Sequence, residues 1–250
     1  MKGLAVSVGA DQVATVEFDR PPHNHFDVEL IAALADAYTA LDEDPMCRAI
    51  LLCSAGRHFC AGANFAAGGD AGGEPLYEQA VRLFAAATPV VAAVQGAAIG
   101  GGLGLALSAD FRVASPSSRF AANFARLGIH HGFGITVTLP AAVGTQAALE
   151  LLYTGRRVMG EEAHALGLCD RLAADGQSRA VAHALAAEIA ASAPLAVRSI
   201  RRTMRGELAD RVRAATEREG AEQAELFLTE DFREGVRATA ERRTPRFSGR

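Results

Sequence analysis

Two glycine-rich turns hold the residues whose types and spacing could do chemistry. The first is His58-Phe59-Cys60-Ala61-Gly62-Ala63-Asn64-Phe65, and the second is Val94-Gln95-Gly96-Ala97-Ala98-Ile99-Gly100-Gly101-Gly102-Leu103-Gly104. Each follows an apolar segment that reads as a strand, and the second opens a helix whose first N–H groups have no intrahelical partner. One N–H group from each turn could donate to the same carbonyl oxygen and stabilise negative charge that develops on it.

Glycines in such turns can also serve close packing or dinucleotide binding. In the structural alternative, the glycines only end the strands and let the helices pack closely on the sheet. Dinucleotide binding is excluded, because Gly102-x-Gly104-x-x-Leu107 lacks the third glycine of that fingerprint and no acidic residue ends the next strand. The residues alone leave the choice between oxyanion stabilisation and close packing open.

The segments that must position these turns alternate between strand-like and helix-like patterns. Short apolar runs predict strands at 4–8, 13–18, 49–53, 90–94 and 111–114, of which the first two should form a hairpin. Helical spacing predicts helices from 28 to about 44, near 76–84 and from 100 to about 109, then at 195–205, 208–228 and 229–243. This alternation predicts an α/β protein whose sheet is covered by crossover helices.

Composition narrows the class of protein further. The chain has 250 residues, half of them hydrophobic, which is enough to bury a full core. Its 25 Lys and Arg against 29 Asp and Glu give a net charge of −4, which argues against a nucleic-acid surface. Glycines interrupt the longest apolar run, 89–109, so a membrane span is not expected. Four cysteines without CxxC spacing, in a chain with no signal-peptide pattern, indicate reduced thiols and a cytoplasmic protein.

The end of the chain adds a third motif. It reads Thr229-Glu230-Asp231-Phe232-Arg233-Glu234-Gly235 and closes with Phe247-Ser248-Gly249-Arg250. With the two turns, it resembles the enoyl-CoA hydratase/isomerase (crotonase) family over essentially the whole chain. The first turn is similar to the family's F-x-A-G-A-D signature, and the ending to E-D-x-x-E-G followed by F-x-G-K/R. The resemblance implies a crotonase-like spiral of ββα units over residues 1–193. It also implies a helical region over residues 194–250 that forms a homotrimer, or a hexamer of two trimers.

The resemblance also implies a substrate and a site. The substrate would be an acyl-CoA thioester, with coenzyme A as part of the substrate and no permanently bound cofactor or metal. By position, the N–H groups of Ala63 and Gly101 would form an oxyanion hole that stabilises a thioester enolate. The Ala61 carbonyl would meet the adenine amino group, and Arg57 would lie near the CoA phosphates. The other substrate-binding residues expected are Asn64, Phe65, Gly100 and Phe124.

The sequence departs from the family where hydration needs carboxylates. Two glutamates in the family hold and activate one water, because the reaction needs both a base and an acid. Here the first position is Gly104 and the second is Phe124, and neither residue can transfer a proton. Gly132 stands where isomerases often have an acid, and Asn64 replaces the signature's aspartate. Asp110, the one carboxylate between Ala93 and Glu150, begins a strand away from the turns.

Three hypotheses address the missing acid and base. His130 and His131 could supply it, because histidine titrates near neutral pH, although paired loop histidines are more often surface features. Asp70 or Glu74 could fold over the site from the loop after Asn64. Alternatively, the protein binds acyl-CoA without turnover as a silent subunit. A different crotonase-type reaction, such as isomerisation, decarboxylation or C–C hydrolysis, also stays open.

The remaining histidines and one cysteine suggest weaker hypotheses. His23 and His25 have a spacing that suits a metal, but no third ligand follows, so we expect a structural role or a role at the edge of the CoA site. His58 is expected to cap the end of a strand. Cys60 has no evident base partner and is expected to fill a place that needs a small side chain.

Overall fold

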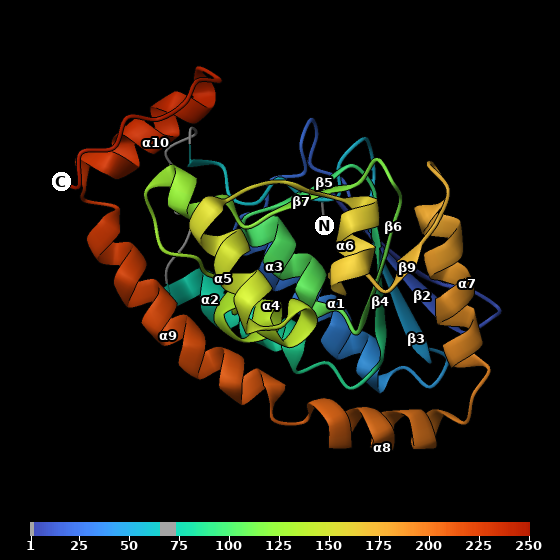
Figure 1. The fold of residues 1–250 in the computed structure, drawn as a ribbon. Helices are drawn as coiled ribbons and strands as arrows, with labels where there is room; N and C mark the ends of the chain where they lie inside the picture. Colours follow the sequence, from blue (N-terminus) through green and yellow to red (C-terminus); the bar gives the residue numbers. More distant parts are fainter. Residues whose placement is uncertain (1–2, 66–73) are drawn as a thin grey trace.

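The strand order of the main sheet brings the loops that form the site to one edge. The computed structural model describes residues 3–65 and 74–250, with only the backbone of Glu74. Six of the described strands form this sheet in the order β1-β2-β3-β4-β6-β9. Figure 1 labels all of them except β1. Their bounds are β1 Leu4–Val8, β2 Val13–Phe18, β3 Ala49–Ser54, β4 Val90–Val94, β6 Phe111–Ala114 and β9 Arg171–Leu172. β1 and β2 form the predicted antiparallel hairpin, and the later neighbours pair in parallel. The carboxyl ends of β2, β3 and β4 therefore lie at one edge.

Alternate residues of the strands enter two separate apolar layers, as the two-residue period of a strand requires. Leu51 and Val91 pack with helix α7 (Ser178–Ala190) on one face. Ile50 and Leu52 face the larger core on the other side. That core contains the apolar sides of α1 (Val28–Glu43), α2 (Glu74–Phe84) and α3 (Gly101–Ser108). The sheet is thus covered on both faces, as the strand and helix alternation predicted.

Helix α1 begins at a capping residue and buries one of its faces. The side chain of Asp27 caps it by accepting a hydrogen bond from the backbone N–H of Leu30 at 2.8 Å. Residues spaced by three and four along the helix, including Leu34 and Leu41, are buried in the core. The cap fixes the end of the loop that joins β2 to α1, and this loop carries His23 and His25.

A second, small sheet lies beside the main one and was not predicted. It contains β5 (Ala97–Ile99), β7 (Arg119–Ala121) and β8 (Val158–Met159) in that order. These strands have two or three residues each, too few to show an alternating pattern in the sequence. β5 follows β4 almost directly and leads into α3, so this sheet fixes the approach to the second glycine-rich turn.

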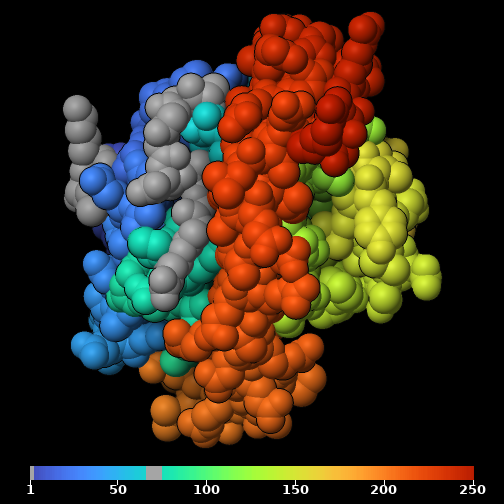
Figure 2. Space-filling model, turned by 90° about the vertical axis from the view of Figure 1, so that its left-hand side faces the viewer, coloured from blue at the N-terminus to red at the C-terminus, as the bar shows by residue number. Residues whose placement is uncertain are grey.

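The other helices complete the wall around that turn. They are the 3₁₀ helix η2 (Asn123–Leu127) and helices α4 (Ile135–Val143), α5 (Thr145–Thr154) and α6 (Gly160–Leu166). The C-terminal helices are α8 (Pro194–Arg205), α9 (Leu208–Leu226) and α10 (Glu230–Ala240). Figure 2 shows α8 to α10 as one band along a face of the molecule. The three predicted C-terminal helices are confirmed, with the last ending earlier because Arg242 has a φ of 56° and Arg243 turns back to pair with Glu234.

Residues 3–65 and 74–250 contain neither a single membrane-spanning helix nor a cluster of metal-binding side chains. No single helix there is long and apolar enough to cross a membrane, although one bent pair, Ser178–Ala190 with Pro194–Leu226, meets that length and composition test. No group of three or more His, Cys, Asp or Glu side chains in this part of the chain could hold a metal ion.

Candidate active site

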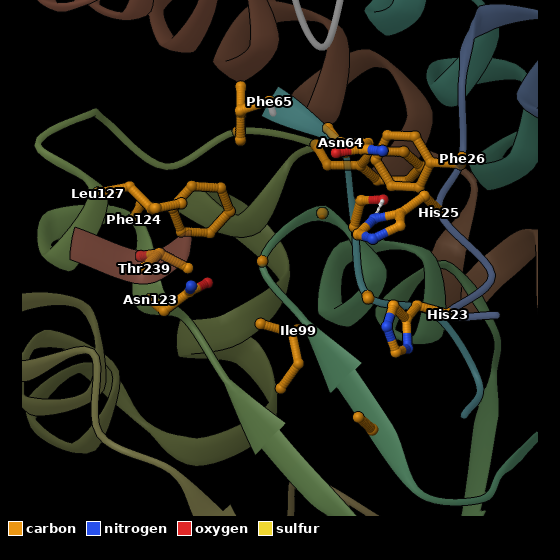
Figure 3. Close-up of a pocket in the computed structure, with 18 of the residues that line it drawn as sticks. His23, His25, Phe26, Asn64, Phe65, Ile99, Asn123, Phe124, Leu127 and Thr239 are labelled. Carbon is orange, nitrogen blue, oxygen red and sulfur yellow. Dashed lines mark hydrogen bonds between the residues drawn. The ribbon is translucent and has the colours of Figure 1, made fainter. Parts of the chain in front are cut away.

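A cavity of about 470 Å³ lies where the loops after β2, β3 and β4 meet. This is the usual ligand position in parallel sheets, outside the carboxyl ends of the strands. Helices α2, η2 and α10 contribute further lining residues. Figure 3 shows Phe124 and Leu127 of η2 near Thr239 of α10 on one side of the cavity. The lining residues include Ala61, Gly62, Ala63, Asn64, Phe65, Gly100, Gly101 and Phe124, all drawn from the predicted turns and the second carboxylate position.

The two glycine-rich turns are held against each other by backbone hydrogen bonds. The N–H of Cys60 donates to the carbonyl of Ala97 at 2.9 Å, and the N–H of Ile99 donates to the carbonyl of Cys60 at 3.0 Å. Gly62 has a φ of 80°, and a β-carbon there would lie 2.7 Å from the carbonyl oxygen of Ile99. Only glycine combines this conformation with so close an approach.

The backbone N–H groups of Ala63 and Gly101 both belong to residues that line the cavity. Within the described residues neither group donates to a backbone or side-chain acceptor. Gly101 is the first residue of α3, so its N–H lies at the positive end of the helix dipole. Two such donors in one cavity can stabilise a developing oxyanion, and the assignment of this role to Ala63 and Gly101 stays a prediction.

Both predicted carboxylate positions are apolar in the structure. Gly104 is buried, and a β-carbon there would lie 2.7 Å from that of Phe133, whose ring is also buried. Phe124 is buried and lines the cavity directly. Asp110 forms ion pairs with Arg201 and Arg205. Among the described residues, no Asp or Glu lines the cavity.

The loop hypothesis falls on residues that the structure does not describe. Asp70 lies outside the described residues, and so does the side chain of Glu74. Their suggested role as an acid or base therefore stays a prediction.

His130 and His131 do not line the cavity. Their rings stack with centroids 4.1 Å apart, and Nδ1 of His130 lies 2.7 Å from the carbonyl of His131. Nε2 of His131 bonds the Thr136 hydroxyl at 2.8 Å. Burial, with His130 close by, lowers the pKa of His131 to about 4. Their suggested role in proton transfer stays a prediction that this placement does not favour.

Three other histidines, His23, His25 and His58, do line the cavity. His23 lies between the other two, with its ring 5.9 Å from that of His25 and 5.7 Å from that of His58. Nδ1 of His25 lies 3.1 Å from the carbonyl oxygen of Gly62. The sequence left open a structural role or a role at the edge of the CoA site for His23 and His25, and nothing in the H-x-H spacing indicated that His25 reaches the cavity.

The cationic residues of the cavity differ from those predicted. Arg57 is exposed and does not line it, whereas Arg119 and Arg157 do. Arg119 begins β7 and Arg157 directly precedes β8, so both depend on the small sheet that the sequence did not reveal. Ala61 lines the cavity, and the role of its carbonyl stays a prediction.

Two further predictions concern residues beside the first turn. Burial raises the pKa of the Cys60 thiol to about 12, and the thiol accepts a hydrogen bond from the N–H of Gly62 at 3.4 Å. Cys60 is therefore a buried packing residue, as expected, and not an activated nucleophile. Phe65 packs against Phe227 and Phe232, with centroids 6.0 and 5.7 Å away, which ties the turn to the C-terminal helices.

Comparisons with known proteins agree with this fold. A sequence model of the enoyl-CoA hydratase/isomerase family matches residues 9–250. The chain is 32% identical over 256 residues to a protein of Bacillus subtilis named a probable enoyl-CoA hydratase, with 98% of this chain and 99% of that protein covered. It is 34% identical to carnitinyl-CoA dehydratase of Proteus mirabilis, with 95% of each covered.

A solved structure gives the same result. The crystal structure of an enoyl-CoA hydratase/isomerase from Pseudoalteromonas atlantica superposes with a TM-score of 0.89 at 34% identity, covering 99% of this chain and 100% of that chain. The fold is therefore that of the crotonase class of enzymes. The chain belongs to the enoyl-CoA hydratase/isomerase family and is an acyl-CoA-metabolising enzyme of hydratase/isomerase type.

Proposed function

We propose that this enzyme binds an acyl-CoA thioester with its carbonyl oxygen between the N–H groups of Ala63 and Gly101, and that the reaction passes through an enolate. The observation that carries the proposal is that both donors belong to residues that line one cavity and that they lack an acceptor among the described residues. Their hydrogen bonds would strengthen as charge moves from the α-carbon to the oxygen. One such donor typically contributes about 10²–10³ in rate.

The polar part of the cavity suits the CoA portion of the substrate. His23, His58, Arg119 and Arg157 line it, and arginine is well suited to phosphate. The Ala61 carbonyl would accept from the adenine amino group, and Arg57 would meet the phosphates from the exposed turn outside the cavity. Coenzyme A enters as part of the substrate, and we propose no permanently bound cofactor.

The apolar part of the cavity suits the acyl group. Its lining includes Phe26, Phe65, Leu76, Phe124, Leu127 and Phe133. Aromatic rings on several sides favour an aromatic or other bulky apolar acyl chain. Because Phe124 and Phe133 fill the space that two glutamates would need, we propose a reaction based on proton transfer at the α-carbon rather than addition of water held by two carboxylates.

Acyl-CoA binding without turnover is the second candidate function. The finding that favours it is the lack of any Asp or Glu among the described residues of the cavity wall. The two candidates differ in whether a bound thioester loses its α-proton.

Calorimetric titration with phenylacetyl-CoA, crotonyl-CoA and free CoA tests the proposal. We expect phenylacetyl-CoA to bind more tightly than free CoA, and the conjugated absorbance of crotonyl-CoA to persist during incubation. Failure of every CoA ester to bind would contradict the proposed function. Rapid loss of the crotonyl absorbance would contradict the proposed reaction type but not the substrate class.

Assembly and location are also proposals. We propose a homotrimer, or a hexamer of two trimers, that forms through residues 194–250. Helix α8 supports this, because none of its residues is buried and Leu195, Ile200 and Met204 are largely exposed. Light scattering after size exclusion would give the mass, and a monomer at micromolar concentration would contradict the proposed trimer or hexamer.

We propose a cytoplasmic location, which fractionation of the native host would test.

A further inference from the structure

His25 is tied to the oxyanion turn by the backbone that carries it. The N–H of Phe26, the next residue, donates to the carbonyl of Gly62 at 3.1 Å, and Phe26 and Ala63 form a parallel bridge. The His25 ring meets the same Gly62 carbonyl. Figure 3 shows His25 and Phe26 entering the cavity from one wall, with Phe124 and Leu127 on the opposite wall. The Gly62 carbonyl and the Ala63 N–H belong to one peptide group and point in opposite directions, and His25 and Ala63 line the same cavity.

The contact with Gly62 fixes the tautomer of His25. A carbonyl oxygen only accepts hydrogen bonds, so the hydrogen of the neutral ring lies on Nδ1, which is 3.1 Å from that oxygen. The Nε2 lone pair is then free, and no described residue donates to it. A neutral histidine that lines a ligand cavity and has one nitrogen oriented by a backbone carbonyl can act as a general base through its other nitrogen.

The other titratable and charged groups of the described cavity wall are less suited to this role. They are His23, His58, Tyr77, Arg119 and Arg157. Tyr77 donates its hydroxyl hydrogen to Gln223 at 2.6 Å, and burial raises its pKa well above the usual range. The guanidinium groups of the two arginines only donate hydrogen bonds. His23 is exposed, and the ring contact recorded for His58 is with His23, at 5.7 Å.

We propose that His25 is the general base of this enzyme, taking a proton from the α-carbon of the bound acyl-CoA. This inference rests on the proposed function. The electron pair of the Cα–H bond forms the enolate double bond, and the carbonyl π pair moves to the oxygen between Ala63 and Gly101. The proton moves to Nε2 of His25, and the imidazolium returns a proton to the α-carbon or another position of the enolate. No oxidant, metal or activated water is needed.

The pH dependence of this step has a definite direction. Burial has the largest effect and lowers the pKa of His25. The hydrogen bond to Gly62 raises this pKa by a smaller amount, and the nearby His23 lowers it again. The net shift is below the ordinary value of 6.5. The neutral, active form therefore predominates at pH 7. The rate of proton abstraction should fall as acid protonates Nε2, with a midpoint below pH 6.5.

Exchange of the α-protons of phenylacetyl-CoA in D₂O tests the proposal, with exchange followed by NMR at saturating substrate. His25→Gln keeps a donor for Gly62 but cannot take the proton. We expect its exchange rate to fall by roughly 10²–10⁴-fold, while its Kd for phenylacetyl-CoA stays close to that of the unmodified enzyme. His183→Gln is the matched control, because His183 is a half-buried residue of α7 outside the cavity and pairs with Asp11 at 3.3 Å.

Each alternative result is informative. Unchanged exchange in His25→Gln, or a loss seen instead in His131→Gln, would overturn the role of His25 and leave the proposed function standing. Binding without exchange in the unmodified enzyme would also overturn it and favour the silent candidate. Absence of binding would refute the proposed function itself. If His25→Gln does not fold, the pH profile of the unmodified enzyme decides, since a midpoint above 6.5 contradicts the proposal.

Discussion

The side chain of Phe133 occupies the space that a side chain at Gly104 would need. A β-carbon at Gly104 would lie 2.7 Å from the β-carbon of Phe133 and 2.9 Å from its ring. Both residues are buried, and the Phe133 ring packs against that of Phe26 at 5.4 Å. A carboxylate side chain at position 104 would therefore collide with Phe133, and the Phe133 ring makes this part of the cavity lining apolar.

This packing predicts that Gly104→Ala is destabilising even though alanine favours helices. The added methyl group must displace Phe133, and overpacking of this kind costs about 1–3 kcal/mol. Gly220→Ala is the matched control, because Gly220 also lies in a helix and its β-carbon would make only ordinary contacts with Tyr77 at 3.7 Å. We expect Gly220→Ala to be neutral or stabilising. Urea denaturation measures both, and equal effects would contradict the account.

Phe124 is predicted to bind the acyl group rather than to transfer protons. Phe124→Ala removes a buried ring from the wall opposite His25 and should weaken phenylacetyl-CoA binding by about 2–3 kcal/mol. Binding of free CoA should be unchanged, because Phe124 lies in the apolar part of the cavity. Calorimetric titration of both ligands measures the difference. An equal loss of affinity for free CoA would indicate that the cavity collapses instead.

Glu219 is predicted to stabilise the start of α4. Its side chain is fully buried and accepts hydrogen bonds from the backbone N–H groups of Gly134 at 2.8 Å and Thr136 at 2.9 Å. Glu219→Ala leaves these two donors without their acceptor and should lower the free energy of unfolding by about 2–4 kcal/mol. The exposed neighbour Glu217 provides the control Glu217→Ala, expected within about 0.5 kcal/mol of the unmodified protein. Urea denaturation at pH 7 tests the pair.

His131 predicts how stability depends on pH. Its pKa is about 4 in the folded protein against 6.5 when unfolded, so the folded state binds this proton less readily. The free energy of unfolding should therefore decrease as the pH falls from 6.5 towards 4, by about 2 kcal/mol after allowance for partial exposure. His131→Gln should remove this part of the pH dependence, and His183→Gln should not. Denaturation at pH 7 and pH 4.5 measures it, and parallel losses in all three proteins would contradict the assignment.

The sequence reveals those parts of the fold that depend on local patterns. The strand at 49–53 and the helix from 28 were predictable because apolar runs and three- and four-residue spacing record burial directly. The glycine-rich turn around Gly62 was predictable as a place where backbone approaches another group closely. The structure gives the reason, because Gly62 has a positive φ and lies against Ile99. The small sheet was not predictable, since its strands are too short to carry a period.

The composition of the site was only half predictable. The two turns could be identified from their own residues, and they meet in the structure. His25, Arg119 and Arg157 could not be placed at the cavity, because the loop after β2 and the small sheet bring them there through contacts distant in sequence. His130 and His131 were chosen for their position in the chain, which does not record that they stack on each other outside the cavity.

Infrared spectroscopy of bound phenylacetyl-CoA, labelled with ¹³C at the thioester carbonyl, tests the central claim most directly. Two hydrogen bonds from Ala63 and Gly101 should polarise the carbonyl and move its stretching band to lower frequency than in water, with a narrower line because the donors are fixed. A band that stays at its solution frequency while the ligand is fully bound would show that the two N–H groups do not meet the thioester oxygen, and would contradict the account.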